Sequence, residues 1–317
     1  MKRVLFIYNR HAGKNKTWGN LSDIINAMTG ESCLVTAYPT QYRGDAGDAI
    51  VRWGNQFDQV VVAGGDGTLS EAIAGAIRME NPPLIGYIPV GTTNDFSKNL
   101  NLPLDSLTEL AVTAVTGEPM VHDLGKFQDR TFLYVAAFGA FTEVSYSTPQ
   151  KVKNVLGYNA YMLEAVKNLI PSLKPHHVKL EFDGNTIEGD YLYGMVSNTT
   201  SVGRFRNFPP GNPDLSDGLL EVTLISAVRD VKEMEEFSRA LLLTDPGQLT
   251  TMLHTFSAPS VKITCEEGLS WSIDGENGGQ HQTVEIETLH HAYTIRHGDR
   301  PLPANAPFWS ALLPRLN

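Results

Sequence analysis

The stretch VVVAGGDGTLSEAIAGA, residues 61–77, restricts the possible folds of this chain more than any other part of the sequence. An apolar run typical of a buried strand ends in two glycines, an acid and a third glycine, and a helix-like pattern follows at once. Glycine is needed where a backbone turns sharply or where another group approaches it closely. We therefore expect a strand, a tight turn and a helix, with a ligand bound against the turn.

Strand-like and helix-like segments alternate over the first part of the chain. The strand-like runs are RVLFIY, CLVTAY, DQVVVA and LIGYIP, and helical patterns over 20–29, 45–55, 69–79 and 105–116 follow them in turn. Alternation of this kind predicts a parallel sheet with helices on both faces. Ligands of such sheets bind beyond the carboxyl ends of the strands. The polar turns NRHAGK, TQYRG, GGDGT and PVGTTNDF all fall there.

The second part of the chain has a different pattern. Short strand-like runs separated by turn signals, such as SVKITCE, LSWSIDG, VEIETL and AYTIRHG, predict an antiparallel β-sandwich. Two helices, over 154–170 and 230–243, interrupt it. A chain of 317 residues is near the size at which one core becomes two. We predict an α/β domain over 1–120, a β-sandwich domain over 121–300, and a tail over 301–317 that packs back on the first domain.

Composition argues against several classes of protein. The 25 basic and 35 acidic side chains give a formal net charge of −10, which argues against a nucleic-acid partner held by phosphate contacts. The two cysteines, Cys33 and Cys265, lack the spacing of a disulfide framework or a zinc site. His290 and His291 are adjacent, and neighbours on a strand point to opposite faces, so no metal site is predicted there. No apolar run reaches the roughly 20 residues of a membrane span, so membrane contact would be peripheral.

Asp66 lies between the buried strand and the first turn of the following helix. Unpaired N–H groups and the positive end of a helix dipole favour an anion there, and the glycines let the backbone press against phosphate oxygens. A carboxylate repels phosphate unless a cation lies between them, so Asp66 suggests Mg²⁺ bound through oxygen ligands and water. A tight turn capped by Asp66 or Thr68 is the alternative without a ligand.

The stretch PVGTTNDF repeats this combination of residues at the end of the next strand. Thr92 and Asn94 are candidates for holding a nucleotide, and Asp95 for reinforcing the metal site. The alternative is a helix that begins near Asn94 with a side-chain N-cap. Two well-known phosphate loops are excluded, because the chain has neither GxxxxGK[ST] nor GxGxxG after its first strand.

The combination of GGDGTLSEAIAG, GYIPVGTTNDF some twenty residues later and YNRHAGK after the first strand closely resembles the diacylglycerol kinase catalytic family, in particular the soluble bacterial lipid kinases. The resemblance covers nearly the whole chain. GGDGT alone is shared with NAD kinases and related to phosphofructokinases, and PxGTxNDF makes the match specific. The resemblance implies a nucleotide-binding α/β domain of the NAD-kinase and phosphofructokinase type, followed by a β-sandwich domain for the lipid substrate.

The resemblance also implies which residues bind ATP and Mg²⁺. The implied ATP site comprises Asn9, Arg10, His11, Ala12, Gly13, Thr40, Gly64, Gly65, Asp66, Gly67, Thr68, Leu69, Ser70, Glu71, Thr92 and Asn94. Arg10 stands where the family usually has a proline, which could alter the rigidity of this loop. The implied Mg²⁺ network around the phosphates comprises Asp66, Asp95 and Asp123. A second, structural Mg²⁺ site would use the carboxylate of Asp217 and the main-chain carbonyls of Asp214 and Leu219, with a plain type I turn as the alternative.

The stretch SWSIDGENGG, residues 270–279, is typical of a hairpin turn. In the family, a DGE sequence at this place supplies the catalytic base, which corresponds here to Glu276. A carboxylate would orient the attacking alcohol and receive its proton, while the metal and backbone N–H groups neutralise the developing phosphoryl charge. Glu276 and Asp66 are thus the implied catalytic residues.

The resemblance implies an ATP- and Mg²⁺-dependent kinase that phosphorylates diacylglycerol to phosphatidic acid, an activity of phospholipid metabolism. An NAD-kinase-like enzyme with a soluble acceptor and a nucleotide-binding regulator without catalysis are the alternatives. The segment 151–174 combines lysines with aromatic and aliphatic residues, as an interfacial helix does. We expect a cytoplasmic protein in peripheral contact with the inner face of the membrane, with a homodimer as one possible assembly.

Overall fold

The computed structural model describes residues 1–13, 21–92, 94–139, 174–202, 205–206, 213–230, 232–233, 236 and 251–299. The expected helix over 154–170, most of the helix over 230–243 and the tail over 301–317 lie outside these residues. The described residues form two compact units. Unit 1 comprises Met1–Leu124, Ser216–Gly218 and the stretch that begins at Leu289, and unit 2 comprises Gly125–Leu215 and Leu219–Thr288. The unit that contains the N-terminus therefore also takes in two later segments of the chain.

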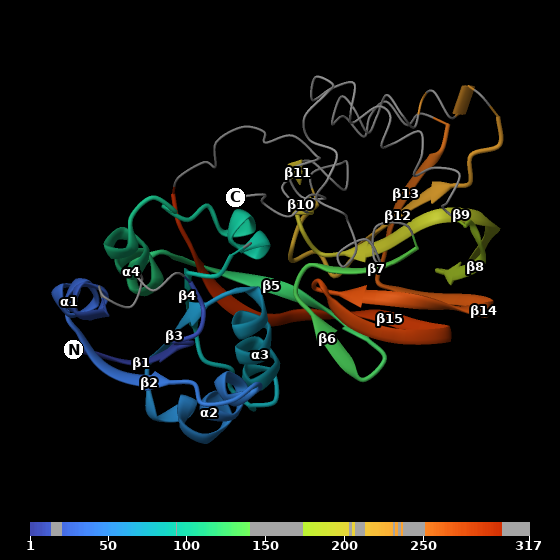
Figure 1. Ribbon diagram of the computed structural model, residues 1–317. Coiled ribbons are helices and arrows are strands. Elements are labelled where there is room, and N and C mark those ends of the chain that lie inside the picture. The colour runs from blue at the N-terminus through green and yellow to red at the C-terminus, as the bar shows by residue number, and fades with distance from the viewer. Residues whose placement is uncertain are drawn as a thin grey trace. The chain divides into compact units, whose positions relative to one another are not determined.

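The sheet of unit 1 contains four consecutive strands in the order β2, β1, β3, β4 (Figure 1). Their bounds are β1 (Lys2–Tyr8), β2 (Cys33–Pro39), β3 (Gln59–Gly64) and β4 (Ile85–Pro89). Each neighbouring pair runs parallel. The last part of β15 (Glu276–His297) extends the sheet, because Ile295 pairs in parallel with Ile85. Every residue of β3 and β4 is buried, as expected for central strands covered on both faces.

Helices follow the strands of unit 1 and cover both faces of its sheet (Figure 1). They are α1 (Leu21–Gly30), α2 (Asp45–Trp53), α3 (Asp66–Ala76) and α4 (Leu107–Thr116), each within about three residues of its expected position. The chain moves outward from β1 to β2 and then back across β1 to β3, so right-handed crossovers place α1 and α2 on opposite faces. Two glycines let α2 and α3 pack closely: a methyl group on Gly75 would lie 2.5 Å from Cα of Gly47.

Two short 3₁₀ helices complete the regular structure of unit 1. They are η2 (Gly54–Gln56), which continues α2, and η3 (Asp95–Leu100), which follows β4. The helix η3 occupies the position at which the sequence suggests an N-capped helix near Asn94.

Antiparallel strands form unit 2. The strand β5 (Glu118–Phe127) runs from unit 1 into unit 2 and pairs there with β6 (Arg130–Phe132). The main order is β13, β12, β9, β7, β14, β15, and β8 pairs with both β9 and β14. The bounds are β7 (Val135–Gly139), β8 (His176–Phe182), β9 (Asn185–Ser197), β12 (Leu220–Ser226), β13 (Leu253–Ala258) and β14 (Ser260–Ile273), with a separate short pair β10 (Ser201–Val202) and β11 (Phe205–Arg206).

Aromatic rings pack at the centre of unit 2. The indole of Trp271 lies edge-on to Phe127 and Phe138, with ring centroids 5.0 and 5.1 Å apart, and all three side chains are buried. Aliphatic side chains from β8, β9, β12, β14 and β15 surround these rings. Such offset and edge-on pairs add to the stabilisation that burial of the aromatic surface provides.

Two strands, β14 of unit 2 and β15, which starts in unit 2 and ends in unit 1, are longer than the sequence pattern indicates. SVKITCE and LSWSIDG are two halves of β14, and VEIETL and AYTIRHG are two parts of β15. The pairing of β14 with β15 shifts register between Thr264 and Leu269, where Gly268 has φ of 79°. The turn-like residues between the predicted runs therefore form irregularities inside continuous strands rather than loops.

A pair of buried histidines lies inside unit 1. The Nε2 atoms of His122 on β5 and His297 at the end of β15 are 2.7 Å apart, so one ring donates a hydrogen bond to the other. The ring of Tyr293 packs beside His122. Burial lowers the pKa of His297 to about 4, because the charged imidazolium would lose its hydration.

We expect this burial to make unfolding pH-dependent. Since the pKa of His297 is lower in the folded chain than its ordinary 6.5, its contribution to stability is present above pH 6.5 and is lost as the pH falls toward 4. The loss should reach about 3 kcal/mol, from about 1.4 kcal/mol per pKa unit. Urea denaturation between pH 7 and pH 4.5 measures it. His297→Gln should flatten this pH dependence, and the control His11→Gln, at an exposed position, should not. An equally steep dependence in His297→Gln would contradict the assignment.

Candidate active site

The loops that follow β1, β2, β3 and β4 are joined at one edge of the sheet of unit 1. The backbone N–H of Asn9 donates to the carbonyl of Ala63 at 2.9 Å, and that of Thr40 donates to the carbonyl of Tyr8 at 3.0 Å. The side-chain amide of Asn9 donates to the Thr68 hydroxyl at 3.1 Å. Because parallel strands end at the same edge, residues that are far apart in the sequence meet there.

The structure places the predicted nucleotide-site residues in or next to these loops. Residues 9–13 follow β1, Thr40 follows β2, residues 64–71 cover the end of β3 and the start of α3, and Thr92 and Asn94 follow β4. Arg10, His11, Gly67 and Thr92 are exposed, and Leu69 is fully buried in the core. The side chain of Leu69 therefore packs in the core of unit 1.

The two glycine-containing turns after β3 and β4 pack backbone against backbone. A methyl group on Gly91 would lie 2.5 Å from Cα of Gly65, and one on Gly64 would lie 2.5 Å from Cβ of Thr68. Real side chains do not come so close, so these glycines are required by the packing. The phenol of Tyr87 donates to the Gly64 carbonyl at 3.2 Å and so holds the end of β3.

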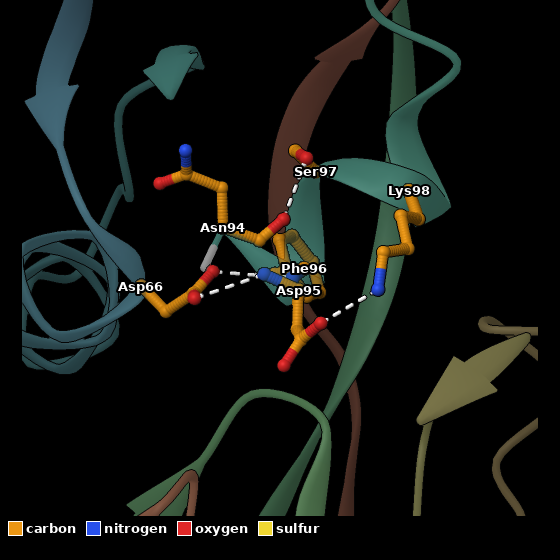
Figure 2. Close-up of polar contacts among 6 residues, drawn as sticks. All are labelled: Asp66, Asn94, Asp95, Phe96, Ser97 and Lys98. Carbon is orange, nitrogen blue, oxygen red and sulfur yellow. Dashed lines mark hydrogen bonds and ion pairs between the residues drawn. The ribbon is translucent and has the colours of Figure 1, made fainter. Parts of the chain in front are cut away.

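Asp66 connects the turn after β3 to the turn after β4 (Figure 2). One carboxylate oxygen accepts a hydrogen bond from the backbone N–H of Asp95 at 2.9 Å, and the other accepts from that of Phe96 at 3.1 Å. Although Asp66 is the first residue of α3, its side chain thus caps the N-terminus of η3. The acid that stands out in GGDGT therefore fixes the position of the second motif.

Asn94 does not act as the side-chain N-cap that the sequence suggests. Its backbone is left-handed, with φ of 51°, and its side chain makes no cap hydrogen bond to η3. Instead, the side-chain oxygen accepts from the N–H of Gly91 at 2.9 Å, and the side-chain amide donates to the Gly91 carbonyl at 2.9 Å. Asn94 closes its own loop, and the capping acceptors come from Asp66.

Asp95 forms an ion pair within η3. The ammonium group of Lys98 lies 2.6 Å from one carboxylate oxygen of Asp95, and both side chains are largely buried, with 18% and 10% of their surfaces exposed. Figure 2 shows the second oxygen of Asp95 pointing away from Lys98.

The pKa of the Asp66 carboxyl group lies above its ordinary value. Burial is the main cause, and the nearby charge of Asp95 also raises this pKa, whereas the two backbone hydrogen bonds lower it.

Asp123 contacts the loop at 216–218, which contains Asp217. The carboxylate of Asp123 accepts from the N–H of Gly218 at 2.6 Å and from that of His291 at 2.7 Å, and it is fully buried. Asp214 and Asp217 are exposed, and Leu219 is partly buried. The Mg²⁺ site at Asp217 and the membership of Asp123 in the phosphate-site network stay predictions.

Glu276 follows a two-residue turn between β14 and β15 in unit 2, as the sequence indicates. Ile273 pairs with Glu276, and the turn residues Asp274 and Gly275 both have positive φ, 49° and 80°. This geometry matches a type I′ hairpin, for which Asp-Gly is a preferred sequence. The carboxylate of Asp274 accepts from the N–H groups of residues 133, 134 and 135 at 2.7–3.1 Å, so the turn is anchored to the start of β7. Glu276 is exposed at the tip of this anchored hairpin.

Two residues that position the site, Lys98 and Asp274, cannot be assigned this role from the sequence. Lys98 neutralises Asp95 three positions away, and this spacing is the one signal for it in the sequence. Asp274 could be recognised as a turn residue, but its three hydrogen bonds to a segment some 140 residues away could not.

Comparison with known proteins places the chain among kinases. Residues 3–127 match the family model described as the diacylglycerol kinase catalytic domain, and residues 137–293 match the YegS C-terminal NAD kinase beta sandwich-like domain. These two matches indicate a kinase in which the catalytic domain, with its loops at the strand ends, is followed by a β-sandwich-like domain. This chain belongs to the diacylglycerol kinase family.

Relatives match over almost their whole length. A protein named diacylglycerol kinase from Bacillus subtilis strain 168 is 30% identical over 298 residues, which are 93% of this chain and 96% of the relative. Another of that name, from Staphylococcus saprophyticus, is 31% identical over 88% of this chain and 90% of the relative. A crystal structure of a diacylglycerol kinase from Bacillus anthracis aligns with a TM-score of 0.72 over 94% of this chain and 97% of that one at 23% identity, which shows a shared fold.

We expect Asp66→Ala to loosen the second loop of the site. The substitution leaves the N–H groups of Asp95 and Phe96 without their acceptors, so the free energy of unfolding should fall by about 2 kcal/mol. Asp66→Asn keeps one acceptor and should lose less. Urea denaturation measures both, with Asp105→Ala at an exposed position as the control. Wild-type stability in Asp66→Ala would show that the two hydrogen bonds do not hold the loop.

Proposed function

We propose that this protein is an ATP- and Mg²⁺-dependent lipid kinase that transfers the γ-phosphoryl group of ATP to the hydroxyl group of diacylglycerol and releases phosphatidic acid. The observation that carries the proposal is the pair of hydrogen bonds to Asp66, which joins the two loops where the family resemblance places the nucleotide. The name of the Bacillus subtilis relative supports diacylglycerol as the acceptor.

The loops at the strand ends fit a triphosphate. Close packing of Gly65 and Gly91 leaves backbone rather than side chains at this edge. The hydrogen bonds at the start of α3 run from the N–H groups of Thr68 and Leu69 to the Gly65 carbonyl. The N–H groups of Asp66 and Gly67 precede them, and the helix dipole favours an anion beside these two. The exposed Arg10 adds a positive charge in the first loop. We therefore assign phosphate binding to the backbone around Gly65 and Gly67, with Arg10 as a supporting cation.

Asp95 fits a Mg²⁺ ligand better than Asp66 does. Both oxygens of Asp66 accept backbone hydrogen bonds, whereas Asp95 has one oxygen paired with Lys98, and among the described residues its second oxygen has no hydrogen-bond partner. Mg²⁺ in kinases is held by one or two carboxylates together with phosphate oxygens. We assign Asp95 as the ligand and Asp66 as the residue that positions it. When bound, Mg·ATP supplies the phosphoryl group and its metal offsets the phosphate charge.

Glu276 is the proposed general base. Its carboxylate would orient the hydroxyl group of the acceptor and take its proton as the new P–O bond forms. The anchored hairpin suits the role of general base, because a base contributes most when its position is fixed before the substrate arrives. The exposure of Glu276 leaves it accessible to an acceptor.

A diacylglycerol acceptor resides in a membrane, so the proposal includes peripheral contact of a cytoplasmic protein with the inner face of the bilayer. In the part of the chain that the structure describes, no helix is long and apolar enough to cross a membrane. The segment 151–174, which the sequence suggests for this contact, lies almost entirely outside the described residues.

The test of the function is strict dependence of ATP turnover on the lipid. Purified protein with Mg²⁺ and ATP should form phosphatidic acid in mixed micelles that contain diacylglycerol and should turn over little ATP in micelles without it. Turnover with NAD as the acceptor would support the NAD-kinase alternative instead. ATP binding without turnover on any lipid of a panel of lipid alcohols would support a regulator and would overturn the proposal.

Glu276→Gln should reduce kcat by at least about 100-fold, because it removes the proton acceptor and leaves the shape of the side chain unchanged. The affinity for ATP should stay near that of the wild type, since the loops of unit 1 are untouched. Glu285→Gln, at an exposed position of the same strand, is the matched control and should keep full activity. A wild-type kcat in Glu276→Gln would exclude it as the base.

A further inference from the structure

Three side chains able to hold a metal ion come together at one place in unit 1, within the described part of the chain. They are Asp123 on β5 and the adjacent His290 and His291 on β15. One ligand atom from each lies within 4.8 Å of the other two. The nearby loop at 216–218 adds the carbonyl oxygen of Ser216, which lies 3.1 Å from Nε2 of His291.

The backbone at His291 makes this cluster possible. Adjacent residues on a regular strand point to opposite faces, which is why the sequence predicts no metal site at this histidine pair. His291, however, has φ of 53°, in the left-handed region that strand residues rarely adopt. The two imidazole rings consequently stack on the same side, with centroids 3.6 Å apart and an interplanar angle of 27°. A local reversal of the backbone thus turns a histidine pair into a pair of neighbouring nitrogen donors.

Asp123 is held in place before any ion arrives. One carboxylate oxygen accepts from the N–H of Gly218 at 2.6 Å, and the other accepts from the N–H of His291 at 2.7 Å. Hydrogen bonds of this kind orient the ligands of metal sites. The side chain of Asp123 is fully buried, whereas 52% of the His290 side chain is exposed. An ion can therefore reach a fixed carboxylate through movable imidazoles.

We propose that Asp123, His290 and His291 form a binding site for a divalent transition-metal ion of the Zn²⁺ type. Two imidazole nitrogens and a carboxylate oxygen suit Zn²⁺ and similar ions, whereas Mg²⁺ takes oxygen ligands. Zinc bonds of about 2.0–2.2 Å place tetrahedral ligands about 3.3–3.6 Å apart. The Nδ1 atom of His290 and the Asp123 oxygen are already 3.0 Å apart. Rotation of the exposed His291 ring brings in the third ligand.

The site would tie together three segments of unit 1 that are distant in the sequence, at residue 123, at 216–218 and at 290–291. An ion that binds the folded chain and not the unfolded one stabilises the fold by mass action. The family resemblance implies Asp123 for the Mg²⁺ network as well, but the proposed site does not use Asp95, to which the Mg²⁺ ligand is assigned, and the inference does not rest on the lipid kinase function. Binding is measured with the metal alone, so its failure leaves the kinase proposal untouched.

The experiment uses untagged, chelator-treated full-length protein and titrates it with Zn²⁺ against a chromophoric competitor. The wild type should bind one equivalent at low micromolar Zn²⁺, and its thermal midpoint should rise. Co²⁺ in place of Zn²⁺ should give visible absorption bands of a site with nitrogen ligands. The buried cysteines, Cys33 and Cys265, do not contribute thiolate ligands. Each of His290→Gln and His291→Gln should weaken Zn²⁺ binding by at least about tenfold, and the double variant should abolish it.

The matched control is a second adjacent histidine pair, His176 and His177 on β8 in unit 2. His177 contacts two exposed acids, Asp190 and Glu188, but this pair is not part of the cluster. His176→Gln/His177→Gln should keep the wild-type affinity for Zn²⁺. Asp217→Asn separates the site from the predicted Mg²⁺ site in the neighbouring loop and should also keep it.

Three outcomes would overturn the inference. One is the absence of stoichiometric Zn²⁺ binding by the wild type. Another is unchanged affinity in His290→Gln/His291→Gln, with circular dichroism showing a folded protein. The third is loss of the site in Asp217→Asn or in the β8 double variant while His290→Gln/His291→Gln retains it.

Discussion

The hydrogen bonds between the carboxylate of Asp66 and the backbone of residues 95 and 96 are the interaction on which the candidate nucleotide site depends. Glycines remove the side chains that would keep the two turns apart, and the acid supplies acceptors for the exposed end of η3. The carboxylate is desolvated, which raises its pKa, so the arrangement has a cost that the two backbone donors and Lys98 offset in part. The need to join the two loops therefore gives a structural reason for a carboxylate at position 66, in addition to any role in binding a ligand.

The elements of unit 1 follow from the sequence because each carries its own periodicity and its own end signals. The hydrogen-bond partners of the site residues do not follow from the sequence. A sequence pattern cannot show that Asp66 caps a helix thirty residues later or that Asn94 forms hydrogen bonds with Gly91. For a related reason, β14 and β15 are longer than the sequence pattern indicates. Residues typical of turns, such as Gly268, break the alternation without ending β14.

The histidine pair on β15 shows how one dihedral angle changes the chemistry that a sequence permits. Alternation of side chains across a strand is a rule of regular backbone, and it fails at His291 because φ is positive there. The N–H of His291 bonds to Asp123, so a buried acid and the unusual backbone stabilise each other. Neither residue signals this arrangement by itself in the sequence.

The return of β15 to the first unit has a consequence for how the protein is made. Ile295 pairs with β4, and the guanidinium of Arg296 donates to the side-chain oxygen of Gln59 at 3.2 Å and to the carbonyl of Gly117. During translation these partners leave the ribosome long before Arg296 does, so the nascent N-terminal unit must wait with one edge of its sheet uncovered until almost the whole of the second unit has been synthesised.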